Sequence, residues 1–188
     1  HCNSYKHAPF ETFCRRRLLP VAAQPSTLQK MAHPLILIPA RMQATRLPGK
    51  PLADIHGEPM IVHVWRRAVE SGAGDVAVAT DAPEIAAAIE AAGGKAVMTS
   101  ADHQTGSDRI KEAADTLDPE RRYDIIVNVQ GDFPTLAPSA IAAAVKPLAD
   151  PAVDIATLAG VIDDEEEKTA PSVVKLIGSE IAPGHMRA

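Results

Sequence analysis

Three cations lie close together on one loop of a chain that carries a net negative charge. Arg41, Arg46 and Lys50 all fall within residues 39–52, a stretch that follows a short apolar run. Guanidinium and ammonium groups gathered in this way can bind and neutralise a polyphosphate, while the prolines of the loop limit its conformational freedom. The alternative is a basic loop that is merely solvated, and composition alone does not decide between the two.

A carboxylate follows another apolar run. Asp132 comes just after residues 125–130. At the end of a strand it could bind a hard, oxygen-preferring ion such as Mg²⁺, which proteins commonly hold with one or two carboxylates plus the phosphates of a substrate. The alternative is that Asp132 only helps to form a turn, and this segment by itself leaves both interpretations open.

Two further loops carry polar groups that could contact a ligand. Thr80 and Asp81 end one apolar run, and residues 105–109 follow another. Asp81 and Ser107 are each suited either to cap the helix that follows or to bind a ligand. Arg109 is harder to explain as a cap, because a cation near a helix N-terminus is unfavourable unless an anion lies close by. We therefore interpret Arg109 as a sign of a phosphate.

The elements that must position these loops alternate between short apolar runs and helical patterns. Buried strands are predicted at residues 35–39, 76–80, 96–99 and 125–130, each a continuous apolar run, as a strand covered on both faces requires. Helices are predicted between them at 60–70, at 83–92, at 108–117 and at 139–148. Residues 153–177 are predicted to form a strand, an exposed turn or helix, and a second strand.

This alternation predicts an α/β fold with an open, mostly parallel sheet flanked by helices, similar to a Rossmann fold. In such a sheet ligands bind at the edge where the strands reach their carboxyl ends. All the polar loops described above follow strands at that edge. Their convergence on one edge strengthens signals that are each modest alone.

Composition excludes several classes of partner. The formal net charge of the 188 residues is −5, and residues 1–30 are themselves basic, so the rest of the chain is more acidic than the total. An acidic body argues against a nucleic-acid surface or an anionic membrane as partner. No run of 18 apolar residues occurs, so no bilayer span is predicted. Both cysteines, Cys2 and Cys14, lie near the start, and a body without cysteine fits a reducing cytosol.

Residues 1–30 differ in kind from the rest. They are rich in Pro, Arg and polar residues and show neither strand nor helix periodicity, and Met31 stands just before the first clear strand. We expect them to form a disordered extension outside the fold. A transit peptide is the alternative, although the segment lacks a clean amphipathic face.

Several segments together resemble one enzyme family. They are residues 39–52, 57–63, 78–81, 98–109 and 127–132. Over residues 34–175 the chain resembles the 3-deoxy-manno-octulosonate cytidylyltransferases, whose fold is that of the nucleotide-diphospho-sugar transferases. The related CMP-sialic acid synthetases share the Pro-Ala-Arg start of the basic loop but not, as a rule, the whole series.

The resemblance implies that the anomeric hydroxyl of the sugar acid attacks the α-phosphate of CTP. Pyrophosphate leaves, and the CMP-sugar serves lipopolysaccharide synthesis. A cytoplasmic, Mg²⁺-dependent enzyme is implied, with a homodimer in its full-length form. By the same likeness Gln130 would approach the sugar acid and Asp132 would bind Mg²⁺. The residues expected to hold the triphosphate are Arg41, Arg46 and Lys50. These three residues and Asp132 are the ones expected to be catalytic. The residues expected to surround the nucleotide are Thr80, Asp81, Ser107 and Arg109.

The sequence also departs from the family pattern. Ala44 replaces a hydroxyl residue usual in the loop, Phe133 stands where many relatives have Glu, and Ala170 replaces an Asn. The family continues past the point that matches Ala188, so we expect residues 31–188 to form a nucleotidyltransferase domain that is incomplete at its C-terminus. Such a domain is expected to bind CTP weakly and to turn over poorly. Two alternatives are another sugar nucleotidyltransferase, such as a CMP-sialic acid synthetase, and a non-catalytic nucleotide-binding fragment.

Overall fold

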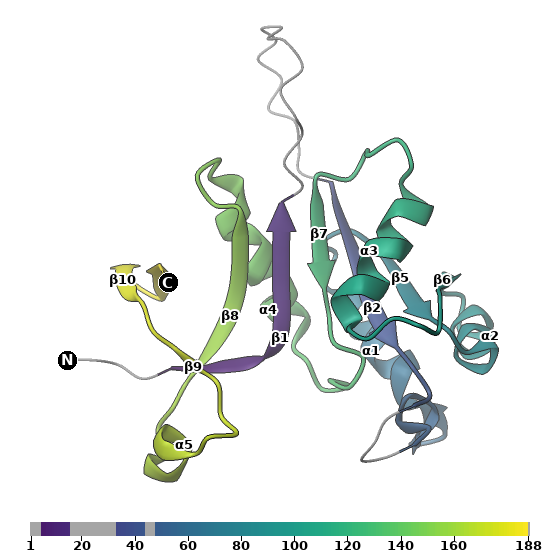
Figure 1. Ribbon diagram of the computed structural model, residues 1–188, viewed down its shortest axis with the longest axis horizontal. Coiled ribbons are helices and arrows are strands. Elements are labelled where there is room, and N and C mark those ends of the chain that lie inside the picture. Colours follow the sequence, from purple (N-terminus) through teal and green to yellow (C-terminus); the bar gives the residue numbers. More distant parts are fainter. Residues whose placement is uncertain (1–4, 16–32, 44–47, 188) are drawn as a thin grey trace, which may run out of the picture.

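The computed structural model describes residues 5–15, 33–43 and 48–187. Figure 1 shows a central sheet with helices packed on both of its faces. The strands on one side of this sheet pair parallel with one another, whereas a strand from the N-terminal part of the chain pairs antiparallel with its neighbours. The predicted fold class, an open and mostly parallel α/β sheet flanked by helices, is confirmed.

Four apolar strands form the parallel part of the sheet. They are β2 (Pro34–Ala40), β5 (Asp75–Thr80), β6 (Ala96–Met98) and β7 (Ile125–Asn128). Over the residues that the structure describes, the main sheet has seven strands in the order β6-β5-β2-β7-β1-β8, with β9 paired to β1. All four strands predicted from the sequence are confirmed.

Helices connect the parallel strands. They are α1 (Met60–Glu70), α2 (Pro83–Ala91), α3 (Gly106–Leu117) and α4 (Pro138–Val145), the last followed by the 3-10 helix η2 (Lys146–Ala149). Pro83 and Pro138 each open a helix, where the missing N–H of proline costs no intrahelical hydrogen bond. The four predicted helices are thereby confirmed. A short hairpin of β3 (Asp54–Ile55) and β4 (Glu58–Pro59) precedes α1.

Strand β2 lies at the centre of the sheet and separates two apolar layers. Ile36 and Ile38 face a core that includes buried side chains of α1, α2 and α4. Leu35 and Leu37 face the opposite core, which includes side chains of α3. These four side chains are at most 2% exposed. The continuous apolar run thus buries both of its faces, as the sequence predicts.

The carboxyl ends of the parallel strands are aligned with one another. Ala40 at the end of β2 pairs with Thr80 at the end of β5, and Thr80 pairs with Met98 at the end of β6. The backbone of Val129, just after β7, also donates to Leu37 of β2 at 3.0 Å. The loops that follow these strands therefore leave the sheet at one common edge.

Strand β1 (Tyr5–Arg15) departs from expectation. The sequence predicts an extension outside the fold over residues 1–30, whereas the structure places Tyr5–Arg15 in the sheet, antiparallel to β7 and β8. Backbone groups supply this pairing, so it does not need the alternating pattern that the segment lacks. The register shifts between His7 and Thr12, and Figure 1 shows β1 bending midway. Residues 1–4 and 16–30 of the predicted extension lie outside the described residues.

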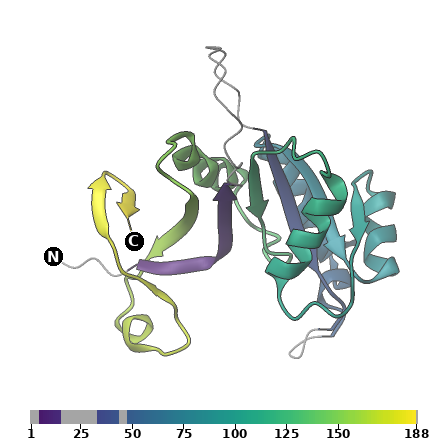
Figure 2. The same ribbon diagram turned by 45° about the horizontal axis from the view of Figure 1, so that its top comes forward.

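The C-terminal part follows the prediction of strand, helix and strand. It consists of β8 (Ile155–Val161), α5 (Glu165–Thr169) and β9 (Lys175–Leu176), and ends in the hairpin of β10 (Ser179–Ala182) and β11 (His185–Arg187). Figures 1 and 2 both show this hairpin on the side of the molecule away from α2. Among the described residues, no helix is both long and apolar enough to cross a membrane.

Candidate active site at the carboxyl edge of the sheet

A cavity of about 140 Å³ opens where the polar loops leave the sheet. Arg41 contributes from the end of β2, and Gln130 from the end of β7. His103, Thr105 and Arg109 contribute from α3 and the loop before it. Three loops that are far apart in the sequence therefore line one cavity, which confirms the convergence predicted from the strand order.

The basic loop and the predicted metal carboxylate meet in a direct contact. Lys50 Nζ lies 2.9 Å from Asp132 Oδ2, and the two side chains are 37% and 45% exposed. Lys50 begins the short 3-10 helix η1 (Lys50–Leu52) after Gly49, whose φ of 73° favours glycine. The N–H of Gly49 donates to the carbonyl of Met42 at 3.0 Å, which closes the loop. Arg46, the third predicted cation, lies outside the described residues.

A glycine lets the loop after β7 approach the end of β2. A Cβ added at Gly131 would lie 2.8 Å from the carbonyl oxygen of Pro39, closer than real Cβ atoms come to other atoms. The backbone at Gly131 can therefore pass β2 only without a side chain. This approach carries Gln130 to the cavity and Asp132 to Lys50. Gln130 is held by its own strand, because its Nε2 donates to Asn128 Oδ1 at 3.3 Å.

Arg109 is buried at the floor of the cavity and is bound by protein groups. It is 3% exposed, and its Nη2 donates to Asp81 Oδ2 at 2.8 Å while its Nη1 donates to Thr99 Oγ1 at 2.6 Å. The sequence predicted an anion near Arg109 and suggested a phosphate. In this structure the anion that contacts Arg109 is the carboxylate of Asp81. Thr80 is fully buried, and its Oγ1 accepts from the N–H of Ala82 at 3.1 Å.

The structure decides between capping and other roles for two residues. Asp81 does not cap α2, whose N-cap is Ala82 without a side-chain hydrogen bond. Ser107 does not cap α3 either, because Thr105 holds that position and its Oγ1 accepts from the N–H of Asp108 at 3.2 Å. Ser107 instead lies exposed in the first turn of α3. Both capping alternatives are therefore wrong.

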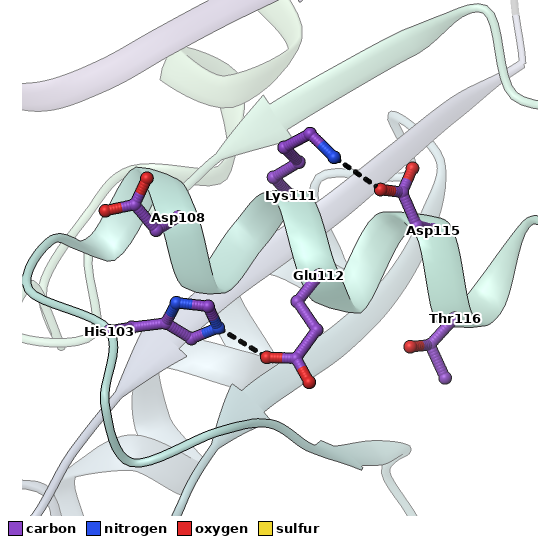
Figure 3. A pocket seen from close by; sticks show the side chains of 6 residues that line it. All are labelled: His103, Asp108, Lys111, Glu112, Asp115 and Thr116. Carbon is purple, nitrogen blue, oxygen red and sulfur yellow. Dashed lines mark hydrogen bonds and ion pairs between the residues drawn. The ribbon is translucent and has the colours of Figure 1, made fainter.

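Sequence reasoning missed two residues beside the cavity. His103 lines the cavity, and its Nε2 contacts Glu112 Oε2 on α3. Figure 3 shows the imidazole and the carboxylate facing each other in an open hollow on the surface of α3. The pKa of Glu112 lies below its usual value, mainly because the N–H of Ser100 donates to the carboxylate and also because His103 contacts it. The sequence signal that could have pointed to His103 was the presence of a histidine in a loop at the ligand-binding edge of the sheet.

The residues present fit a divalent ion only in part. Within the part of the chain that the structure describes, no group of three or more His, Cys, Asp or Glu side chains could hold a metal ion. Asp132 offers one accessible carboxylate beside the basic loop. A single carboxylate matches a Mg²⁺ that takes its other ligands from phosphates and water.

An open, mostly parallel sheet with cations and a carboxylate at its carboxyl edge is typical of α/β proteins that bind ligands at that edge. Residues 35–180 match the family model described as Cytidylyltransferase. The chain therefore belongs to the cytidylyltransferase family.

Curated relatives agree with this family. The chain is 65% identical over 158 residues to a 3-deoxy-manno-octulosonate cytidylyltransferase of Methylobacterium nodulans, a match that covers 84% of this chain and 64% of the relative. It is 64% identical over 154 residues to the protein of the same name from Nitrobacter hamburgensis, covering 82% and 60%. The chain thus spans less than two thirds of the length of these relatives.

Solved structures show the same fold. A CMP:2-keto-3-deoxy-manno-octonic acid synthetase in complex with CTP is 44% identical, with a TM-score of 0.60, covering 65% of this chain and 50% of that one. A cytidylyltransferase from Leptospira borgpetersenii is 27% identical, with a TM-score of 0.53, covering 62% and 48%.

Proposed function

We propose that this chain forms the nucleotide-handling part of an enzyme that transfers CMP from CTP to 3-deoxy-manno-octulosonate. The relatives described above carry that name, and the solved structure at 44% identity contains CTP. The observation that carries the proposal is the placement of Arg41, Lys50 and Asp132 at one edge of the sheet, beside the cavity that Gln130 also lines.

The reaction is a substitution at phosphorus. The anomeric oxygen of the sugar acid forms a bond to the α-phosphorus of CTP, and the bond from that phosphorus to the bridging oxygen of the β-phosphate breaks. The electron pair of this bond leaves with pyrophosphate, and the hydroxyl proton passes to solvent. Catalysis of this kind depends mainly on positioning and on neutralising charge. Arg41 and Lys50 would neutralise the phosphates, and Arg46 would join them from the same loop.

Lys50 and Asp132 would exchange partners when the nucleotide binds. Both side chains are partly exposed, so their pairing in the free protein contributes little stability and is readily broken. The ammonium of Lys50 would then contact phosphate oxygens. Asp132 would hold a Mg²⁺ that neutralises further phosphate charge.

The other predicted residues receive more limited roles. Arg109, Asp81 and Thr80 would shape the floor of the nucleotide site, because their polar atoms are already bound within the protein. Ser107 is exposed at the start of α3 and free to contact the nucleotide from there. Gln130 would face the sugar acid. The cavity is smaller than a typical small-molecule pocket, which fits a chain that contributes one part of a larger site.

The wider setting is also part of the proposal. The product would serve lipopolysaccharide synthesis, and the enzyme would act in the cytoplasm as a homodimer in its full-length form. A second candidate is a different sugar nucleotidyltransferase, because the phosphate-binding loop does not itself select the base or the sugar.

The test is calorimetry of CTP binding to the 188-residue chain, with and without Mg²⁺, for the wild type and Asp132→Asn. We expect binding that strengthens with Mg²⁺ and that weakens about tenfold in the variant, because an uncharged amide is a poorer ligand for Mg²⁺ than a carboxylate. UTP and GTP serve as competitors. Preference for UTP or GTP would favour the second candidate, and Mg²⁺-independent binding unaffected by Asp132→Asn would contradict the proposed role of Asp132.

A further inference from the structure

The loop before α3 forms one wall of the cavity but has little apolar packing to hold it. Of residues 99–105, Thr99 is buried, and the others are exposed or half-buried. Burial therefore contributes little to fixing the conformation of this loop. Polar contacts must position it if the wall is to keep one shape.

Two side chains one turn apart on α3 supply such contacts. Arg109 reaches the start of the loop, where its Nη1 donates to Thr99 Oγ1 at 2.6 Å. Glu112 reaches further along the loop, where its Oε2 accepts from the N–H of Ser100 at 2.9 Å and contacts His103 Nε2. One carboxylate oxygen thus joins two points of the loop to the helix.

The contact with Glu112 sets the orientation of the histidine ring. A carboxylate can only accept a hydrogen bond, so His103 Nε2 carries a proton. Figure 3 shows the ring lying beside α3 with this nitrogen toward the carboxylate. His103 also lines the cavity that Arg41 and Gln130 line, whereas Glu112 lines the hollow on the surface of α3. Glu112 would therefore influence a bound ligand through His103 and not by touching it.

We propose that Glu112 is a positioning residue for nucleotide binding, which holds residues 100–105 and turns the ring of His103 to form the wall of the cavity. The inference rests on the proposed function, because it takes CTP as the occupant. Glu112 is suited to this role and not to a purely structural one, since its side chain is 38% exposed and Arg109 already anchors the buried start of the loop.

The first experiment compares Glu112→Gln with Lys111→Gln. The glutamine keeps the size of Glu112 but removes its charge, and Lys111 is the neighbouring residue, 78% exposed and paired with Asp115 outside the cavity. We expect the dissociation constant of CTP to rise about tenfold in Glu112→Gln, because the loop is then held by a weaker, uncharged hydrogen bond. Lys111→Gln should bind as the wild type does, and both variants should melt within a few degrees of it.

The second experiment asks whether Glu112 acts through His103. His103→Asn should also weaken CTP binding, and the double variant with Glu112→Gln should be weaker by less than the product of the two single effects, because both changes act on one contact. In the free protein, hydrogen exchange at the Ser100 amide should be about tenfold faster in Glu112→Gln than in Lys111→Gln, because the acceptor of that amide is no longer charged.

The outcomes separate the inference from the proposed function. Failure of the wild-type chain to bind CTP would count against the proposed function, and the Ser100 exchange rates would still show whether Glu112 holds the loop. Normal CTP affinity in Glu112→Gln, with a wild type that binds, would overturn the inference and leave the proposed function standing. Unchanged exchange at Ser100 would overturn it as well.

Discussion

Two ion pairs at the same edge of the sheet differ sharply in their surroundings. The pair of Arg109 and Asp81 lies at the floor, with side chains 3% and 18% exposed. The pair of Lys50 and Asp132 lies at the rim, with side chains 37% and 45% exposed. Their distances are similar, at 2.8 Å and 2.9 Å. Geometry alone therefore does not separate a structural pair from one that can open to a ligand.

Solvent exposure makes the difference. Breaking a buried pair leaves a charge in a medium that stabilises it poorly, whereas water replaces the missing partner at an exposed pair. Arg109 also has a second partner in Thr99, which ties the floor to the loop before α3. We infer that the floor pair maintains the shape of the site, while the rim pair is available to exchange its partners for phosphate and metal.

The largest effect is expected from Asp81→Ala. Removing this carboxylate leaves the guanidinium of Arg109 buried without its counter-charge, which should lower the free energy of unfolding by about 3–5 kcal/mol. Chemical denaturation followed by circular dichroism measures this decrease. The double variant Asp81→Ala/Arg109→Met should recover part of it, because the unpaired charge is then gone. A single variant as stable as the wild type would remove the distinction between floor and rim.

The next largest effect is expected from Gly131→Ala. This variant tests the close approach of the loop after β7 to the end of β2, which places Asp132 beside Lys50. The added methyl would meet the carbonyl oxygen of Pro39, so the loop must shift at a cost of about 1–3 kcal/mol in unfolding free energy. Gly106→Ala is the matched control for stability, since its Cβ would lie in ordinary contact with Pro39 at 3.5 Å. Equal melting temperatures for the two variants would show that the close approach at Gly131 is not required.

The rim pair itself should matter little for stability. Lys50→Met should change the free energy of unfolding by less than about 1 kcal/mol, as at other exposed pairs. The same variant should weaken CTP binding about tenfold, because no ammonium remains at this position to bind phosphate. Thermal melts and calorimetry on the same sample check the two statements. A large decrease in stability with intact CTP binding would reverse the roles of rim and floor.

The sequence predicted the parallel body of the fold well because both faces of each strand are covered. Continuous apolar runs such as 35–39 have few other stable environments, and the helices between them show clear apolar faces. The common edge followed from the parallel order, so the meeting of Arg41, Gln130 and the loop before α3 could be predicted. For Lys50 and Asp132 the sequence predicted only that both lie at this edge, not that their side chains are in contact.

The rest depended on information that a single segment does not carry. Strand β1 joins the sheet through backbone pairing with β7 and β8, and this requires an available strand edge more than a residue pattern. The partner of Arg109 could not be predicted from the sequence, because Asp81 lies 28 residues away. A cation near a helix N-terminus requires a nearby anion, and either a carboxylate of the protein or a bound phosphate meets that requirement. His103 and Glu112 were missed because neither belongs to a recognisable metal or catalytic spacing.

A third ion pair tests whether exposure outweighs good geometry. Arg66 and Glu58 form two parallel hydrogen bonds, at 2.8 Å and 2.9 Å, although both side chains are 43% exposed. The hydrogen bond from Arg66 holds the pKa of Glu58 below its usual 4.5, with His63 nearby adding to the effect. A carboxyl whose pKa is lower in the folded state contributes stability that is present above pH 4.5 and is lost as the pH falls through the folded pKa.

The smallest effect is therefore expected from Glu58→Gln, and it should depend on pH. The melting temperature of the wild type should exceed that of the variant slightly at pH 6. The difference should shrink as the pH falls from about 4.5, the unfolded pKa, through the lower folded pKa at which Glu58 of the folded protein becomes protonated. Melts of both proteins at a series of pH values measure the difference. A difference that stays constant down to pH 3 would mean that the charge of Glu58 contributes nothing. A difference as large as that for Asp81→Ala would mean that paired hydrogen bonds, and not burial, separate the floor of the site from its rim.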